Sequence, residues 1–198
     1  MATGTDAAFG FAVWDKLIRS TLYAVVTAPT INIYHNDIVV HGGAHLATRF
    51  GGLPVILDSA VPDGVAGLVG SVLSIFDENM DPVKRIVAAE TGDGTVAGYV
   101  MVADSPDQLF VAQEDSGGNA ITATEGGQNA DIVSQTLCAG TATTGISLME
   151  IDSDSTTNTT LQLKLIAPHP LDTITEDYCR YIVQINEHYY GDTLAGIA

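Results

Sequence analysis

Short apolar runs separated by turn-forming residues recur along almost the whole chain, and this spacing limits the folds available to it. The runs span about four to eight residues and return about every 10 to 12 residues, as strands do, and 20 glycines are distributed along the chain. Leu68–Phe76 is one such run, and the polar segment 77–82 after it favours a turn. The pattern predicts an all-β protein, a barrel or sandwich of short antiparallel strands with little helix.

Three segments carry the clearest pairing signals. Leucine occupies every second position of 161–166, and along 181–186 the alternate positions hold Tyr181, Val183 and Ile185. This period of two is typical of strands with one buried face. Upstream, the apolar residues of 31–40 alternate on both sides of an Asn-Asp pair. That arrangement predicts a hairpin.

The first apolar cluster of the chain lies between residues 9 and 22 and includes the only tryptophan. The spacing of its apolar residues over 13–18 fits a short amphipathic helix, and an extended arm is the alternative. The segment either packs into the core as a first element or anchors into a partner, because buried aromatic residues dominate many interfaces. In the second case the partner-binding residues are Phe9, Phe11, Trp14, Leu17, Ile18 and Leu22.

The chain divides most naturally at its linker-like segments. We expect an N-terminal arm over 1–30, a β-subdomain over 31–90, and a second β-subdomain with a C-terminal tail over 91–198. The division near residue 90 rests on the run T-G-D-G-T, whose residues favour turns over strands. One continuous β-domain is the alternative.

The charge is strongly acidic, with 24 Asp and Glu against 7 Lys and Arg and a net charge of −17. Residues 86–162 hold eleven carboxylates and no Lys, Arg or His. Affinity for nucleic acid rests on cations that neutralise phosphates, so we expect no direct nucleic-acid binding. The acidic half either serves solubility alone or forms a solvated face that repels its neighbours while another face docks.

The N-terminal residues lack the basic and continuous apolar regions of a signal peptide. No window of about 20 residues stays apolar enough to cross a bilayer. We therefore expect a chain that is synthesised and used in soluble form, with no membrane partner.

The histidines give little support for a metal site. His41 and His45 have the spacing of a helical ligand pair, but two glycines lie between them, and a helix is not expected there. His35, like these two, is best interpreted as a surface or turn residue, and His169, between two prolines, has no nearby Cys, Glu or second His. Among acidic residues, the Glu150 cluster with Asp152 and Asp154 lacks the Gly and Glu that complete a calcium-binding EF-hand loop. We expect no metal and no cofactor.

Catalytic patterns are absent as well. The carboxylates Asp104, Asp107, Glu114 and Asp115 include no pair that the sequence brings to the separation a glycosidase needs. Nucleophile, phosphate-binding and dinucleotide-binding motifs do not occur, so we expect no enzymatic activity. The only two cysteines, Cys138 and Cys179, are best interpreted as buried thiols, with a disulfide as the alternative.

Three stretches carry a family resemblance. They are T-T-G-I-S-L-M-E-I-D-S-D-S-T-T-N-T-T-L-Q-L-K-L-I at 143–166, V-Q-I-N-E-H at 183–188, and V-M-V-A-D-S-P-D-Q-L-F-V-A-Q-E-D at 100–115. Together they resemble the head decoration, or cement, proteins of tailed bacteriophages, over roughly residues 67–190. No single motif in them is a chemical signature, so the resemblance rests on its length.

The resemblance implies a virion protein that is made in the host cytoplasm, binds the outer surface of the assembled head and bridges subunits of the major capsid protein. We also expect self-association, as a trimer at lattice threefold positions or, alternatively, a dimer at twofold positions. Two other classes stay open. A polysaccharide-degrading enzyme would need converging carboxylates, and a receptor- or glycan-binding fibre or spike module would need exposed aromatic residues, for which Tyr189 and Tyr190 are the obvious pair.

Overall fold

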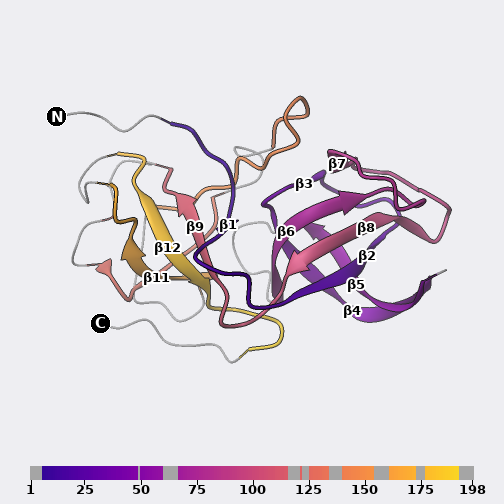
Figure 1. Cartoon of the computed structure of the whole chain (residues 1–198), viewed down its shortest axis with the longest axis horizontal. Helices are drawn as coiled ribbons and strands as arrows, with labels where there is room; N and C mark the ends of the chain where they lie inside the picture. The colour runs from indigo at the N-terminus through magenta and orange to yellow at the C-terminus, as the bar shows by residue number, and fades with distance from the viewer. Residues whose placement is uncertain are drawn as a thin grey trace.

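The computed structural model describes residues 6–48, 50–59, 67–115, 121, 125–133, 140–153, 161–172 and 177–191, with side chains for all of these except 57–59. The regular elements of this part of the chain are all strands (Figure 1), and no α-helix occurs in it. The all-β prediction is confirmed.

Five strands close into a barrel on the right-hand side of Figure 1. Their order around the barrel is β2-β5-β4-β6-β8. The pair β2 and β5 is parallel, and the other neighbours are antiparallel. The strands are β2 (Ser20–Val26), β4 (Ile38–Thr48), β5 (Gly51–Ser59), β6 (Leu68–Phe76) and β8 (Val96–Ala103). The bounds of β6 are those predicted from its sequence.

The barrel forms because alternate apolar residues of its strands meet in one buried cluster. All five strands contribute, through Tyr23, Val25, Val39, Ile56, Val69, Val72, Val100 and Val102. A two-stranded sheet of β3 (Ile33–Tyr34) and β7 (Arg85–Ile86) adds Ile33 and Ile86 to this cluster. β6 and β8 approach so closely at Gly70 that a Cβ atom there would lie 1.8 Å from the carbonyl oxygen of Ala103.

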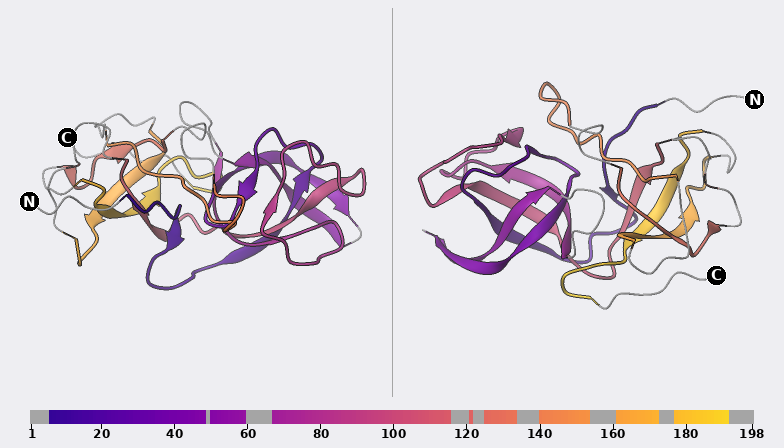
Figure 2. Two further views of the ribbon diagram at one scale, coloured as in Figure 1. Left: turned by 90° about the horizontal axis from the view of Figure 1, so that it is seen from above. Right: turned by 180° about the vertical axis from the view of Figure 1, so that it is seen from behind.

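A second, open sheet of five strands lies beside the barrel, as all three views in Figures 1 and 2 show. Its order is β1-β9-β12-β11-β10, and every pair is antiparallel. The predicted strands over 161–166 and 181–186 are its central pair, in which Leu165 lies opposite Val183. The strands are β1 (Ala12–Val13), β9 (Leu109–Gln113), β10 (Asn129–Ala130), β11 (Leu163–Pro168) and β12 (Arg180–Ile185).

A second buried apolar cluster joins the barrel to the second sheet. Ile38, Val40 and Leu68 of β4 and β6 belong to the same buried cluster as Phe110 and Val183 of the second sheet. Strand pairing also crosses the dividing point expected near residue 90, because β8 pairs with β2 and β6. Apart from β1, which pairs with β9, the strands of the second sheet therefore all follow β8, and the chain leaves the barrel between Ala103 and Leu109.

Two local predictions need correction. The hairpin over 31–40 is wrong, since β3 pairs with β7 while β4 pairs with β5 and β6. The turn itself exists, with Asn36 at a φ of 68°, and the Asp37 carboxylate accepts a hydrogen bond from the Tyr34 amide at 2.7 Å. The two flanking strands then diverge to different partners. The helix over 13–18 is also wrong, because Ala12–Val13 pairs with β9 and residues 14–19 form no helix.

Candidate functional site

The segment between β1 and β2 crosses the surface in a fixed conformation. The buried side chain of Gln108 accepts a hydrogen bond from the Ile18 amide at 2.9 Å and donates one to the Lys16 carbonyl at 3.1 Å. One carboxamide thus holds the main chain on both sides of Leu17. The side chains of Leu17 and Ile18 are 46% and 49% exposed, so the chain presents two large apolar residues from a backbone that is tied down.

The six predicted partner-binding residues do not act as one set. Phe11 is buried in the apolar cluster that joins the barrel to the second sheet. This residue therefore follows the alternative in which the segment packs into the core of its own chain. Phe9, Trp14 and Leu22 are partly buried. Of the six, only Leu17 and Ile18 are exposed, each by about half.

Arg19 lies next to this apolar pair and is held by Asp104. The guanidinium Nε donates to Asp104 Oδ1 at 2.8 Å, and Nη2 donates to the Asp104 carbonyl at 2.6 Å. The hydroxyl of Tyr23 donates to Asp104 Oδ2 at 2.8 Å. Burial acts to raise the pKa of Asp104, but the hydrogen bonds from Arg19 and its neighbours outweigh it and keep that pKa below its usual value. Asp104 is therefore an ionised anchor for Arg19.

The C-terminal segment after β12 returns to the barrel at the same place. The Tyr189 amide donates to the Leu68 carbonyl at 2.7 Å, and the ring of Tyr189 stacks on His41 with centroids 3.8 Å apart and planes at 11°. Tyr190 lies under the guanidinium of Arg19, whose central carbon is 5.6 Å from the ring centroid. The two tyrosines, 43% and 45% exposed, also contact each other edge to face at 5.0 Å.

Side-chain contacts join Arg19, Tyr190 and Tyr189, and Leu17 and Ile18 directly precede Arg19 in the chain. We call the surface formed by these residues the seam face: Leu17, Ile18, Arg19, Tyr189 and Tyr190. It draws on both the barrel and the chain that leaves the second sheet. Each part is held by a buried partner, through Gln108, Asp104 or His41. Its composition of tyrosine, arginine and branched apolar residues is typical of binding surfaces that carry interaction hot spots.

Two buried histidines support the seam face from below. His41 Nδ1 accepts from the Gly43 amide at 2.7 Å, and His188 Nδ1 accepts from the Tyr190 amide at 3.0 Å. The Nε2 of His41 has no hydrogen-bond partner among the described residues, whereas a hydrogen bond with the Val69 backbone acts to raise the pKa of His188. Burial is the main cause that lowers the pKa of both imidazoles, so both are neutral at neutral pH.

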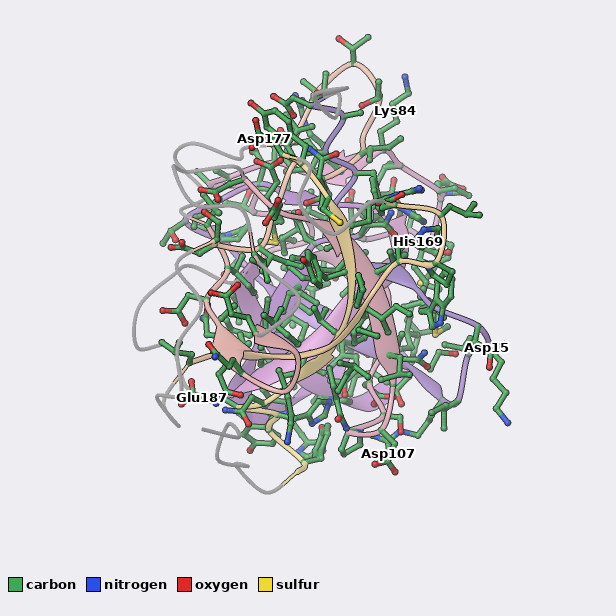
Figure 3. The ribbon with its side chains drawn as sticks, turned by 90° about the vertical axis from the view of Figure 1, so that its left-hand side faces the viewer. Asp15, Lys84, Asp107, His169, Asp177 and Glu187 are labelled. Carbon is green, nitrogen blue, oxygen red and sulfur yellow. The ribbon has the colours of Figure 1, made fainter. Side chains whose placement is uncertain are left out.

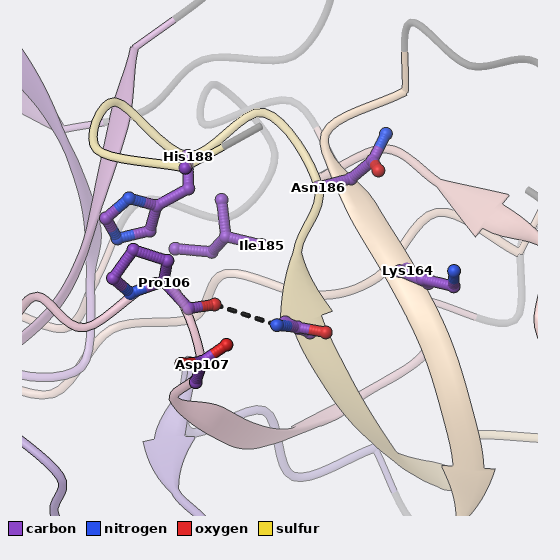
Figure 4. A pocket seen from close by; sticks show the side chains of 8 residues that line it. Pro106, Asp107, Lys164, Ile185, Asn186 and His188 are labelled. Carbon is purple, nitrogen blue, oxygen red and sulfur yellow. Dashed lines mark hydrogen bonds between the residues drawn. The ribbon is translucent and has the colours of Figure 1, made fainter. Parts of the chain in front are cut away.

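A small polar pocket lies beside His188, between the loop before β9 and the end of β12 (Figure 4). Its volume is about 240 Å³. Gln184 Nε2 donates to the Pro106 carbonyl across it at 2.8 Å. Asp107, Lys164 and Asn186 complete a lining that offers both donors and acceptors.

The remaining candidate residues take structural roles or lie apart. His45 and His35 are exposed, and no group of three or more His, Cys, Asp or Glu that could hold a metal lies among the described residues. Asp154 and Cys138 are outside the described residues, so the disulfide alternative stays open. Cys179 is buried, and its Sγ lies 3.7 Å from the Arg180 carbonyl.

Glu114 is the most buried of the four carboxylates considered for catalysis. Its two oxygens accept hydrogen bonds from the Ile121 and Cys179 amides at 2.8 and 3.4 Å. Burial raises the pKa of Glu114, and the two amides partly offset that shift. Its geometry is that of a tether between loops of the second sheet.

Comparison with family models, with curated proteins and with solved structures found no match to this chain. In the described part of the chain, no helix has the length and apolarity to cross a bilayer. Figure 3 views the second-sheet end, where the labelled acidic residues Asp15, Asp107, Asp177 and Glu187 lie around the rim.

The sequence indicated only part of the seam face. Leu17 and Ile18 belonged to the predicted binding set, and the adjacent tyrosines were visible as a pair. No local sequence pattern indicated the roles of Arg19, Asp104 and His188. Arg19 and Asp104, for example, are 85 residues apart in the chain. Their meeting depends on β2 and β8 pairing in the barrel, with Ser20 opposite Ala103.

Proposed function

We propose that this protein decorates the outer surface of a tailed-bacteriophage head, where it binds the major capsid protein and bridges capsid subunits. The seam face is the observation that carries the proposal, because it is a preorganised, partly apolar surface on an otherwise acidic chain. The sequence resemblance supports the choice of partner. No chemical transformation is part of this function.

Modest contacts between each copy and the capsid would suffice for stable binding. Binding that occurs only on the assembled shell stabilises that shell by mass action. Many copies on one lattice add avidity when each copy bridges two subunits. The fixed backbone around Leu17 lowers the entropy cost of docking, since few side-chain or loop conformations must be frozen. The net charge of −17 keeps the remaining surface solvated and away from packaged DNA.

Binding to purified, assembled shells tests the proposal. The double substitution Leu17→Asp with Ile18→Asp places two charges on the seam face without touching a buried residue. We expect the affinity to fall at least about tenfold, which corresponds to about 1.4 kcal/mol. Val87→Asp, at a similarly exposed residue away from this face, is the matched control and should bind as the unmodified protein does. Equal affinities for all three proteins would refute the docking role of the seam face.

A second candidate function is glycan or receptor binding in a fibre or spike. The exposed rings of Tyr189 and Tyr190 and the polar pocket next to His188 favour it, because ligand sites combine aromatic surface with a few placed polar groups. Glycan binding that is lost in Tyr189→Ala, together with no binding to shells, would select this function over decoration.

A further inference from the structure

Two buried histidines, His41 of β4 and His188 of the segment after β12, lie under the tyrosine pair of the seam face. They are 7% and 6% exposed. The His41 ring stacks on Tyr189 at 3.8 Å and meets Tyr190 edge-on at 5.8 Å, and the His188 ring lies 6.0 Å from that of Tyr190. The two tyrosines therefore rest on two titratable groups that come from distant parts of the chain.

Both histidines accept a backbone hydrogen bond through the same ring nitrogen. His41 Nδ1 accepts from the Gly43 amide at 2.7 Å, and His188 Nδ1 accepts from the Tyr190 amide at 3.0 Å. An imidazole nitrogen accepts a hydrogen bond only while it carries no proton. Protonation converts Nδ1 into a donor that faces another N–H group, so each amide loses its acceptor. These two contacts thus require neutral rings.

The tyrosine pair is attached to the barrel through few backbone contacts. Beyond the end of β12 at Ile185, the described chain meets the barrel through one β-bridge, between His188 and Leu68. The Tyr189 amide donates to the Leu68 carbonyl at 2.7 Å, and the Tyr190 amide donates to His188 Nδ1. A proton on that nitrogen removes one of these two amide bonds.

The groups around His41 give its charged form no net support. Burial lowers the pKa of His41, and repulsion from His45, on the same strand, lowers it further. Besides the two seam-face tyrosines, the ring of Tyr23 on β2 meets it edge-on at 6.2 Å, and the Tyr23 hydroxyl donates to Asp104. Aromatic rings attract a cation, but a proton on Nδ1 would face the Gly43 amide.

Charges of both signs lie near His188, and burial outweighs them. Among the described residues, Asp104 and Asp107 act to raise the pKa of His188, and Arg19 acts to lower it. Asp104 is itself bound by Arg19, whose Nε donates to Oδ1 at 2.8 Å. A hydrogen bond with the Val69 backbone also acts to raise the pKa of His188, but burial is the largest cause and keeps it lowered.

We propose that His41 and His188 form a latch that holds Tyr189 and Tyr190 against the barrel at neutral pH and releases them in acid. With both rings neutral, the stack and the amide contacts persist and the seam face is complete. With a proton on Nδ1, a buried charge replaces an acceptor, and the tyrosine pair separates from the barrel so that the imidazoles reach water. The latch is a property of the free protein, whereas any acid sensitivity of shell binding that follows from it rests on the proposed function.

The direction of the pH dependence follows from the lowered pKa of each imidazole in the latched state. After release the rings are hydrated, and their pKa returns toward the ordinary 6.5. Between that value and the lower pKa of the latched state, each ring takes up a proton only on release. As pH falls through this window, release becomes about tenfold more favourable per pH unit for each histidine.

Amide hydrogen exchange, followed by NMR, tests the latch in the unmodified protein. After correction for the intrinsic pH dependence of exchange, protection at the Tyr189 and Tyr190 amides should fall at least about tenfold between pH 7 and pH 5. At every pH, protection at these two amides should be lower than at Val100, because the latch opens without unfolding the barrel. Low concentrations of urea should leave this local opening unchanged, since it exposes little surface.

Asparagine substitutions separate the latch from a merely structural role of the two rings. In His188→Asn the side-chain Oδ1 occupies the same place along the side chain as Nδ1, accepts from the Tyr190 amide and does not titrate. His41→Asn does the same for the Gly43 amide. In the double variant, protection at the two tyrosine amides should change less than about twofold between pH 7 and pH 5. His35→Asn, at an exposed histidine beside β3, is the matched control and should keep the full response.

Three results would each overturn the latch: protection at Tyr189 and Tyr190 that does not fall with pH, protection there equal to that at Val100, or a double variant that keeps the fall. If the double variant does not fold, His188→Asn alone decides, because it should lose about half of the logarithmic change. A protein that binds shells at no pH would refute the proposed function and leave the latch standing.

Discussion

The barrel and the second sheet are ordered by different interactions. The five barrel strands close on themselves, so each has two hydrogen-bonded neighbours. The second sheet is open, and its two edge strands, β1 and β10, have two residues each. Its surrounding loops are instead held by buried polar side chains. Glu114 binds two loop amides, and Gln162 Oε1 accepts from the Ile132 amide at 3.1 Å.

This difference indicates which kind of substitution should destabilise each region. A closed barrel depends on close backbone packing all round, because one displaced strand breaks two ladders. An open sheet with long connections depends on individual side chains, since a buried amide without its acceptor costs the full desolvation energy. Substitutions of single residues should therefore disrupt the two regions in distinguishable ways.

Gly70→Ala should have the largest effect, because the new Cβ would lie 1.8 Å from the Ala103 carbonyl oxygen at a φ of +156°. We expect a loss of about 3 kcal/mol or more in the free energy of unfolding, measured by urea titration. Gly94→Ala is the control, since Gly94 also has positive φ but no atom within 4 Å of its Cβ position; it should cost about 1 kcal/mol. Similar costs for both would show that close packing of β6 on β8 is not what the barrel depends on.

Glu114→Ala should have the second largest effect and a local signature. Removal of the carboxylate leaves the Ile121 and Cys179 amides without that acceptor, so we expect a loss of about 2 kcal/mol. Hydrogen exchange should accelerate at those two amides and stay unchanged at Val100 in the barrel. Asp107→Ala, at an exposed carboxylate, should change stability by less than about 0.5 kcal/mol. Uniformly faster exchange in both regions would contradict independent anchoring of the second sheet.

The sequence predicted the elements of both regions better than their partners. The strands β11 and β12 followed from alternation over 161–166 and 181–186, because a period of two records which face of a strand is covered. β6 followed from the short apolar run 68–76 and the turn residues after it. The pairing of β3 with β7 could not be predicted, since strands of two residues carry no usable period. Only part of the seam face could be predicted from the sequence, because the stacking of His41 on Tyr189 joins residues that only the complete fold brings together.

His41→Phe should have the smallest effect at neutral pH, within about 1 kcal/mol. The imidazole Nε2 has no partner among the described residues, and the hydrogen bond lost at Nδ1 comes from the amide of Gly43, an exposed residue at which water can replace it. The signature of this substitution is the pH dependence. Burial, with repulsion from His45 second, lowers the pKa of His41 below 6.5. Between these two pKa values the His41 imidazole is protonated in the unfolded chain but neutral in the folded protein. The free energy of unfolding therefore falls as pH falls from the unfolded pKa to the folded one.

Thermal or urea unfolding between pH 7 and pH 5 checks this slope. The unmodified protein should lose stability across that window, and His41→Phe should lose less, with the remaining slope due partly to His188, whose pKa burial also lowers. If stability falls equally with pH in the two proteins, His41 is not held neutral beneath Tyr189.

A density map of intact particles that contain this chain tests the central claim most directly. The account predicts many copies on the outside of the shell, with Leu17, Ile18 and Tyr189 buried against capsid subunits and the acidic rim of the second sheet in solvent. A map that places the chain inside the shell or in a few copies at the tail, or that leaves the seam face in solvent, would contradict it.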